Sequence, residues 1–204
     1  NREETFVVKV PASQVVSITG ENGLWTVKAV DQSVTKATTN TASILQHLYL
    51  DKNLLGQLGN GGSDFKTNRE LKTLSVSSNY YKTLEVKENK NLKTLNASSN
   101  LLENIDLTGL SHLVDLDLSK NLFAGSLVLP QNTYRNIDLR VNKFKISTLP
   151  DLPNGTPASA YHYDLQERYV LPQTELTVGK DWIDLSSEFH AKGVASSQKE
   201  TKYT

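Results

Sequence analysis

The chain contains no cysteine and no methionine among its 204 residues. Without cysteine, disulfide bonds and thiolate chemistry are excluded, and cysteine usage gives no indication of the cellular compartment. Basic and acidic residues are equally numerous, at 22 each, so the net charge favours neither nucleic acid nor an anionic membrane as a partner. No apolar run approaches the roughly 20 residues that span a bilayer, and we expect no membrane insertion by this segment.

The chain also lacks the patterns of helices, signal peptides and common catalytic sites. The repeats described below show no apolar period of an amphipathic helix, and the polar start, NREE, is not a signal peptide. The four histidines have no metal-ligand spacing, and no set of serine, histidine and acid can be assigned. The glycine-rich segment 56–62 opens no helix, which argues against a phosphate cradle. We therefore expect no enzyme activity, no metal and no cofactor.

What the sequence does contain is one nine-residue pattern that recurs at constant spacing. It reads LKTLSVSSN from Leu71, LKTLNASSN from Leu92, LVDLDLSKN from Leu113 and YRNIDLRVN from Tyr134. The closing asparagines are separated by 21 residues three times in succession. This is the leucine-rich repeat pattern, and 21 residues lies within the period of that solenoid.

The spacing of the pattern predicts how the coils stack. The apolar residues of one copy cannot be buried within a single coil, so successive coils must pack on one another. Within each copy apolar and polar residues alternate as in a half-buried strand, which predicts a parallel sheet. The inward asparagine would lose about 1 to 3 kcal/mol if it were unpaired, so we expect it to bond the backbone of its turn and of the next coil. This asparagine ladder comprises Asn53, Asn79, Asn100, Asn121 and Asn142.

Two further coils precede the four regular copies. One reads LQHLYLDKN from Leu45, and a degenerate first repeat runs from Leu24 to Val34. The interval from Asn53 to Asn79 is five residues longer than the period, and we place the excess in the glycine-rich segment 56–65. The chain is therefore predicted to form six coils.

The fold class predicted is a leucine-rich repeat solenoid, mainly β, with few or no helices. A curved parallel sheet of about six coils spans residues 24–149, after an N-terminal β cap at 1–23 that covers the first coil. Prolines from Pro150 onwards are expected to end the repeats, and a tyrosine-rich strand from Tyr161 to close the last coil. Residues 150–204 are expected to form a C-terminal cap. The tail after residue 173 reads as one or two strands, which either pack as part of this cap or begin a following, Ig-like β module.

The register also predicts which side chains face solvent from the sheet. One outward column comprises Thr26, His47, Thr73, Thr94, Asp115 and Asn136, and its neighbour comprises Lys28, Tyr49, Ser75, Asn96, Asp117 and Asp138. Basic residues, Lys72, Lys93, Lys120, Arg135 and Arg140, are predicted at the margins. On this face the first coils therefore carry aromatic residues, the middle coils carry small hydroxyl residues, and the last two coils carry carboxylates.

Two groups on this face are candidates for ligand binding. Trp25, His47 and Tyr49 are a candidate aromatic anchor, because large amphipathic rings dominate binding hot spots. The alternative for Trp25 is packing beneath the cap. Asp115, Asp117 and Asp138 offer oxygen ligands suited to Ca²⁺, but the interpretation we favour is a solvated acidic face balanced by Arg135 and Arg140. The binding residues predicted are Trp25, His47, Tyr49, Asn96, Asp115, Asp117, Asp138 and Arg140.

The chain resembles the leucine-rich repeat proteins of bacterial surfaces. The resemblance rests on the 21-residue unit, on the LKTL and LDLSKN sequences within it, and on the LPDLP segment that ends the repeats and is followed by a tyrosine-rich strand. It implies an extracellular or cell-envelope location, Ig-like modules after the repeats, and adhesion to host or neighbouring-cell molecules. Internalin-like adhesins differ in having a 22-residue unit and a helical cap, so no particular partner is implied.

The function expected is that of a monomeric, non-catalytic module that binds a protein or glycan through the concave sheet, with no nucleic-acid partner. Two alternatives remain open from the sequence. The repeats can act as a structural spacer that presents another domain, or as a carbohydrate-binding accessory to an enzyme system.

Overall fold

The computed structural model describes residues 4–7, 15–18, 24–39, 41–58, 64–125 and 127–167. Several sequence predictions lie outside these residues. They are the strands expected in the tail after residue 167, the possible start of an Ig-like module there, and the centre of the glycine-rich segment at 59–63.

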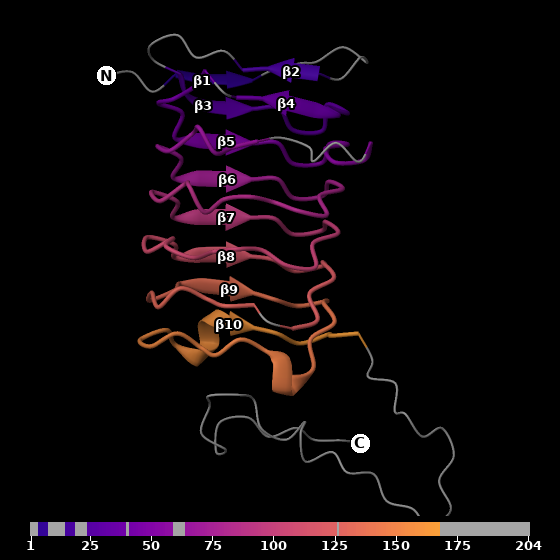
Figure 1. Cartoon of the computed structure of the whole chain (residues 1–204), viewed down its shortest axis with the longest axis vertical. Coiled ribbons are helices and arrows are strands. Elements are labelled where there is room, and N and C mark those ends of the chain that lie inside the picture. Colours follow the sequence, from indigo (N-terminus) through magenta and orange to yellow (C-terminus); the bar gives the residue numbers. More distant parts are fainter. Residues whose placement is uncertain are drawn as a thin grey trace, which may run out of the picture.

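The protein is a parallel β-solenoid of about six turns with almost no helix, as predicted. Its main sheet stacks eight short parallel strands in a single column, one strand from each level (Figure 1). In order these are β1 (Glu4–Val7), β3 (Leu24–Lys28), β5 (His47–Tyr49), β6 (Thr73–Ser75), β7 (Thr94–Asn96), β8 (Asp115–Asp117), β9 (Asn136–Asp138) and β10 (Tyr161–His162). The six predicted coils supply β3 and β5 to β9, and one further strand pairs at each end.

The register of the sheet is the one that the repeat predicts. Leu74 of β6 pairs with Leu95 of β7, which pairs with Leu116 of β8 and then with Ile137 of β9. These side chains are at most 1% exposed, so each continues the core of its neighbour. The predicted degenerate first repeat is confirmed, because Thr26 of β3 lies opposite His47 of β5.

The predicted asparagine ladder forms, but the partner of each asparagine outside its own turn is the preceding coil, whereas the sequence analysis expects the next coil. In the middle of the stack the Asn100 side-chain carbonyl accepts a bond from the Tyr81 N–H at 3.0 Å. Its amide group donates to the carbonyls of Val76, Ala97 and Ser98 at 3.0 to 3.2 Å. All five ladder asparagines are at least 94% buried, and each bonds its own turn and the coil before it.

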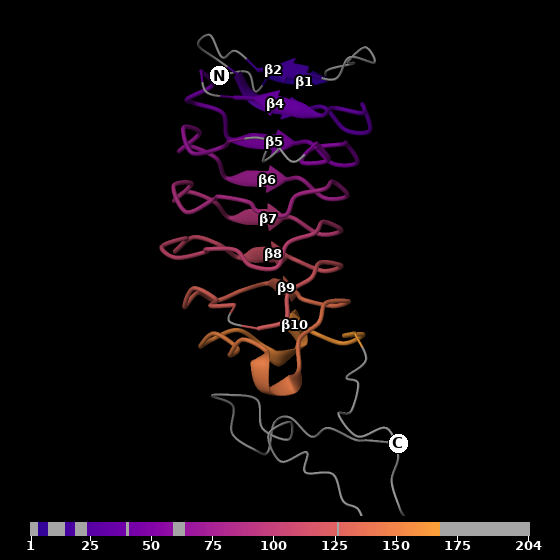
Figure 2. The same cartoon turned by 45° about the vertical axis from the view of Figure 1, so that its right-hand side comes forward.

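The return side of the coils is extended rather than helical. β2 (Val15–Ser17) and β4 (Lys36–Thr38) form a small parallel sheet there, beside the first levels of the column (Figure 2). In the described ranges the helical segments are two single turns of 3-10 helix, η1 (Ile146–Thr148) and η2 (Ala158–Ala160). The expected N-terminal β cap therefore contains β1 and β2, and each pairs with a strand of the first repeat.

A second set of buried amides, which the sequence analysis missed, supports the return side. Asn68 donates to the carbonyls of Thr39 and Ala42 at 3.0 and 2.8 Å. Asn89 donates in the same way to Phe65 and Asn68 at 2.9 and 2.8 Å. The signal was present, because both asparagines stand three residues before the first leucine of a repeat.

The five extra residues lie within the segment where they were expected. Leu55 and Phe65 are both fully buried, and their positions in the sequence are ten apart. The equivalent core residues of the next coil, Tyr81 and Val86, are five apart. The sheet is undisturbed by this difference, since β5 and β6 pair in the common register.

The last strand is closed by a glutamine that takes the place of the ladder asparagine. The Gln166 side chain accepts from the Phe144 N–H at 3.1 Å and donates to the carbonyls of Leu139 and Tyr163 at 2.9 and 2.7 Å. Asn142 makes equivalent bonds one coil earlier. The stack thus gains one more level after the prolines, because those prolines lie before β10 rather than within a strand.

Candidate binding face

The outward columns of the sheet are those predicted, strand by strand. Thr26, His47, Thr73, Thr94, Asp115 and Asn136 lie opposite one another in sequence along the stack, and so do Lys28, Tyr49, Ser75, Asn96, Asp117 and Asp138. Most of these side chains are partly exposed, whereas Ser75 and Asp138 are buried. We refer to these two columns as the sheet face.

The first coils bring two of the predicted aromatic-anchor residues together. The Lys28 ammonium lies 5.1 Å from the centre of the Tyr49 ring, a geometry suited to cation–π attraction. Beside Tyr49, the His47 Nδ1 lies 3.0 Å from the Thr73 hydroxyl. Trp25 is half-buried and stands one residue before the sheet face, where its carbonyl accepts from Gln46. Trp25 therefore belongs to the margin of the candidate anchor.

The middle of the sheet face is small and polar, and its side chains support the turns. The Asn96 side-chain carbonyl accepts from the Ser98 N–H at 3.1 Å and from the Ser98 hydroxyl at 2.7 Å. Ser75 stands at a column position where the following strands have an amide or an acid. The acceptor at this level comes instead from Asp51 of the preceding coil. Asp51 accepts from the hydroxyls of Ser75 and Ser77 and from the Ser77 N–H. Asn96 is thus held by local bonds.

At the acidic end of the sheet face, two of the three carboxylates are paired with the arginines that the favoured interpretation named. Arg135 forms an ion pair with Asp115, and Arg140 binds Asp138 through two guanidinium nitrogens. Asp117 accepts from the Ser119 N–H and hydroxyl at 3.0 and 2.7 Å. Most of the acceptor capacity of these carboxylates is therefore already used within the chain.

The electrostatic environment of Asp138 differs from that of an exposed acid. Burial would raise the pKa of its carboxyl, but the hydrogen bonds and positive charge of Arg140, with His162 nearby, lower that pKa below its ordinary value. The same pairing raises the pKa of the Arg140 guanidinium. Both groups are therefore charged at neutral pH, and the pair is a fixed feature of the face.

The three carboxylates do not form a calcium site in this arrangement. Among the residues that the structure describes, no group of three or more histidine, cysteine or acidic side chains converges as metal ligands would. Ca²⁺ requires six to eight oxygen ligands, and Asp115 and Asp138 are each engaged by an arginine. The calcium alternative gains no support from the geometry.

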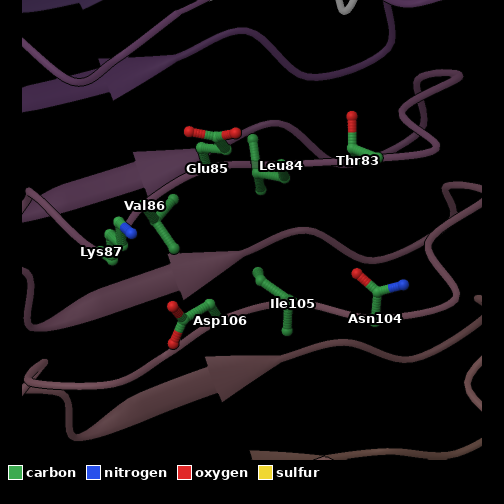
Figure 3. A pocket seen from close by; sticks show the side chains of 8 residues that line it. All are labelled: Thr83, Leu84, Glu85, Val86, Lys87, Asn104, Ile105 and Asp106. Carbon is green, nitrogen blue, oxygen red and sulfur yellow. The ribbon is translucent and has the colours of Figure 1, made fainter.

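A shallow depression lies on the return side, away from the sheet face. Figure 3 shows its lining, in which Leu84, Val86 and Ile105 provide the apolar part. Glu85 and Asp106 stand around it, and Glu85 is also paired with Lys66 at 2.8 Å. Its volume of about 240 Å³ is below the range of ordinary ligand pockets, which begins near 300 Å³. A small-molecule site is therefore not supported here.

Basic side chains gather at the margin where the chain enters β6 and β7. Lys72 and Lys93, predicted at this margin, stand directly before the two strands, and the Lys93 N–H donates to the Lys72 carbonyl at 2.9 Å. Arg69 and Lys90, which the sequence analysis did not single out, stand three residues before them and are exposed. Their spacing in the sequence could have identified them, because Arg69 precedes Lys90 by 21 residues, as Lys72 precedes Lys93.

In the part of the chain that the structure describes, no helix is long and apolar enough to cross a membrane. Comparison with family models found none that matches the chain, and a search of curated proteins found no match either.

Proposed function

We propose that the protein is a non-catalytic binding module of an exported bacterial surface protein, and that it recognises a protein or glycan through the sheet face. The resemblance of its repeats to bacterial surface proteins supports the extracellular or cell-envelope location. The observation that carries the binding role is the set of outward side chains on β3 and β5, where Lys28, His47 and Tyr49 are presented together.

A rigid surface is well suited to recognition. Every pair of neighbouring strands in the main sheet is hydrogen-bonded, and the turns are fixed by ladder asparagines that are at least 94% buried. Side chains and backbone that are already ordered lose little conformational entropy when a partner binds. A stack of coils of this kind therefore presents its outward residues in one geometry.

The first coils are the stronger half of the candidate site. At the other end, Asp115, Asp117 and Asp138 are bonded to Arg135, Ser119 and Arg140, so a ligand would have to displace existing partners. Tyr49, in contrast, offers a partly exposed ring and a hydroxyl beside a cation. Binding energy concentrates in residues of this type.

A pull-down from host or microbial-community extracts with the whole chain tests the proposal. His47→Ala combined with Tyr49→Ala should reduce capture of the specific partner at least tenfold, since an aromatic hot spot contributes about 2 kcal/mol or more. Tyr80→Ala is the matched control, because Tyr80 is 40% exposed but lies outside the sheet face. Equal capture by both variants would contradict a role for the sheet face.

A spacer is the second candidate, and the local pairing of the last coils favours it. Carboxylates that are bonded within the chain stabilise the stack without requiring a ligand. If neither variant changes capture or attachment to cells, while deletion of whole coils changes the presentation of a linked domain, the repeats act as a spacer.

A further inference from the structure

Four basic side chains lie together on the side of β6 and β7 where the chain enters these strands. They are Arg69, Lys72, Lys90 and Lys93, whereas the chain as a whole has no net charge. Arg69, Lys90 and Lys93 are exposed, and Lys72 is half-buried. We refer to these four residues as the basic margin.

Like charges are stacked directly on one another in this margin. Lys72 and Lys93 occupy equivalent positions on neighbouring coils, joined by a backbone hydrogen bond of 2.9 Å. Arg69 and Lys90 also occupy equivalent positions, each following a buried asparagine of the return side. Neighbouring strands are roughly 5 Å apart, and like charges at that distance repel one another.

Part of this repulsion is offset at Lys90, whose ammonium donates to the Thr108 carbonyl at 3.4 Å and acts on the Asp106 carboxyl. The ion pairs found in the described part of the chain involve none of the four basic residues. Three acids lie between Arg69 and Lys93 in the sequence. Glu70 follows Arg69 directly, and the Asn91 amide donates to it at 3.4 Å. Glu85 is paired with Lys66, and Glu88 stands two residues before Lys90.

Other lysines of the protein are arranged differently. Lys66 and Lys87 also stack on the return side, but acids lie beside them and Lys66 is paired with Glu85. Lys52 at the opposite edge has Ser78 as its equivalent on the next coil. In the basic margin, by contrast, two pairs of stacked cations form no ion pair among the described residues.

Next to the basic margin the sheet face is neutral and rich in hydrogen-bonding groups. Thr73 and Thr94 directly follow the two lysines and lie opposite each other, and Ser75 and Asn96 form the next row. Small side chains leave this surface flat. A ligand lying across β6 and β7 would thus meet hydroxyl and amide groups on one side and cations on the other.

We propose that the basic margin and the adjoining part of the sheet face bind an acidic polysaccharide, a chain that carries carboxylate or sulfate groups among its hydroxyls. The anionic groups would bind the lysines and Arg69 through charge-assisted hydrogen bonds. The sugar hydroxyls would bind Thr73, Thr94 and Asn96. This inference rests on the proposed binding function and specifies the class of its ligand.

The same residues fit nucleic acid less well. Single strands are usually held by aromatic side chains on which successive bases stack, and the rows beside the basic margin carry threonine, serine and asparagine instead. An acidic peptide carries fewer hydroxyl groups than a sugar chain to pair with these rows of hydroxyl and amide side chains. The chemistry of the surface therefore favours a polysaccharide.

Binding of the whole chain to defined polymers tests the inference, with polygalacturonate, dextran sulfate, neutral dextran and a single-stranded oligonucleotide as probes. The protein should bind one or both acidic polysaccharides saturably, and the affinity should fall as salt is raised because exposed charges are screened. Lys72→Gln with Lys93→Gln should weaken that binding at least tenfold, since two charge-assisted contacts are lost.

Lys52→Gln with Lys82→Gln is the matched control, because it removes the same charge from exposed positions outside the basic margin and should change the affinity less than twofold. Equal losses in both double variants would overturn the inference. So would tighter binding of the oligonucleotide than of either acidic polysaccharide, or the absence of binding to all four polymers. Capture of another partner that depends on Tyr49 but not on Lys72 and Lys93 would leave the proposed function intact and contradict this inference alone.

Discussion

Single residues with a positive φ shape the turns that follow β5 to β10. The residue before each ladder asparagine adopts φ between 53° and 56°, and Leu165 before Gln166 has φ of 57°. In most coils this position is serine or lysine, but in the last regular repeat it is Val141. A β-branched side chain in the left-handed region is strained, whereas asparagine tolerates it.

Val141→Asn is therefore expected to stabilise the protein by about 1 kcal/mol. The valine is 41% exposed, so little apolar burial is lost in the exchange. Urea unfolding followed by circular dichroism measures the effect. Val128→Asn is the control, because Val128 is 75% exposed and is not among the residues with positive φ; a similar gain in that variant would show that the backbone is not the cause.

The pairing of Asp138 with Arg140 makes stability depend on pH. Burial works against the charged carboxyl, but the bonds from Arg140 prevail and lower the pKa of Asp138 in the folded state. A carboxyl whose pKa is lowered on folding stabilises the protein fully above its unfolded value of about 3.9. That contribution is lost as the pH falls through the folded value.

Arg140→Gln should raise the pKa of Asp138, because burial then lacks its opposing charge. Acid unfolding should consequently begin at a higher pH than in the unchanged protein, and the carboxyl titration can be followed by NMR. Lys120→Gln removes one positive charge from another exposed position and serves as the control. The explanation fails if both variants have the same acid midpoint.

At the scale of elements, each coil from β5 to β9 consists of a three-residue strand, a turn closed by an amide, and an extended return. The terminal strand β10 has only two residues, so Gln166 supplies an unusually large share of its contacts. Gln166→Ala should therefore increase hydrogen exchange in β10 and its turn at least tenfold, while exchange in β5 to β8 changes little, since coils interact with their neighbours.

Glu167→Ala is the corresponding control for β10. Glu167 is exposed and its ion pair with Lys143 is 3.2 Å long, an interaction of a kind that contributes at most about 1 kcal/mol. If Glu167→Ala increases hydrogen exchange in β10 as much as Gln166→Ala does, the Gln166 side chain is not the group that holds this strand in place.

The sequence was sufficient to predict most of the coil but not the details of its ends. A strict period of 21 determined the strand pairing and the outward columns, because a shift by one residue would expose the leucines. Gln166 escaped prediction because it follows Asn142 by 24 residues and differs in type. The role of Asp51 in supporting Ser75 and Ser77 depends on side-chain geometry between coils, which spacing alone does not reveal.

At the scale of the whole molecule, stability should be distributed along the stack. Leu95 of β7 is 1% exposed and lies between Leu74 and Leu116. Leu95→Ala should destabilise the protein by about 2 to 5 kcal/mol and weaken the coupling between the two halves. We therefore expect a broader urea transition, as in other repeat proteins whose neighbours are uncoupled.

Leu149→Ala provides the comparison, because Leu149 is also buried, at 3% exposed, but lies near the end of the stack. Leu149→Ala should destabilise the last coils of the stack only, so the main urea unfolding transition should stay sharp. An equally broad transition in both variants would show that position along the stack has no influence.

The ten-residue interval between Leu55 and Phe65 shows that the outline of this solenoid can change while β5 and β6 remain paired in register. Length added at this point does not shift the following strands. This interval is consequently a natural place to graft a foreign peptide or an epitope tag, because added length there leaves the register of the sheet face unchanged.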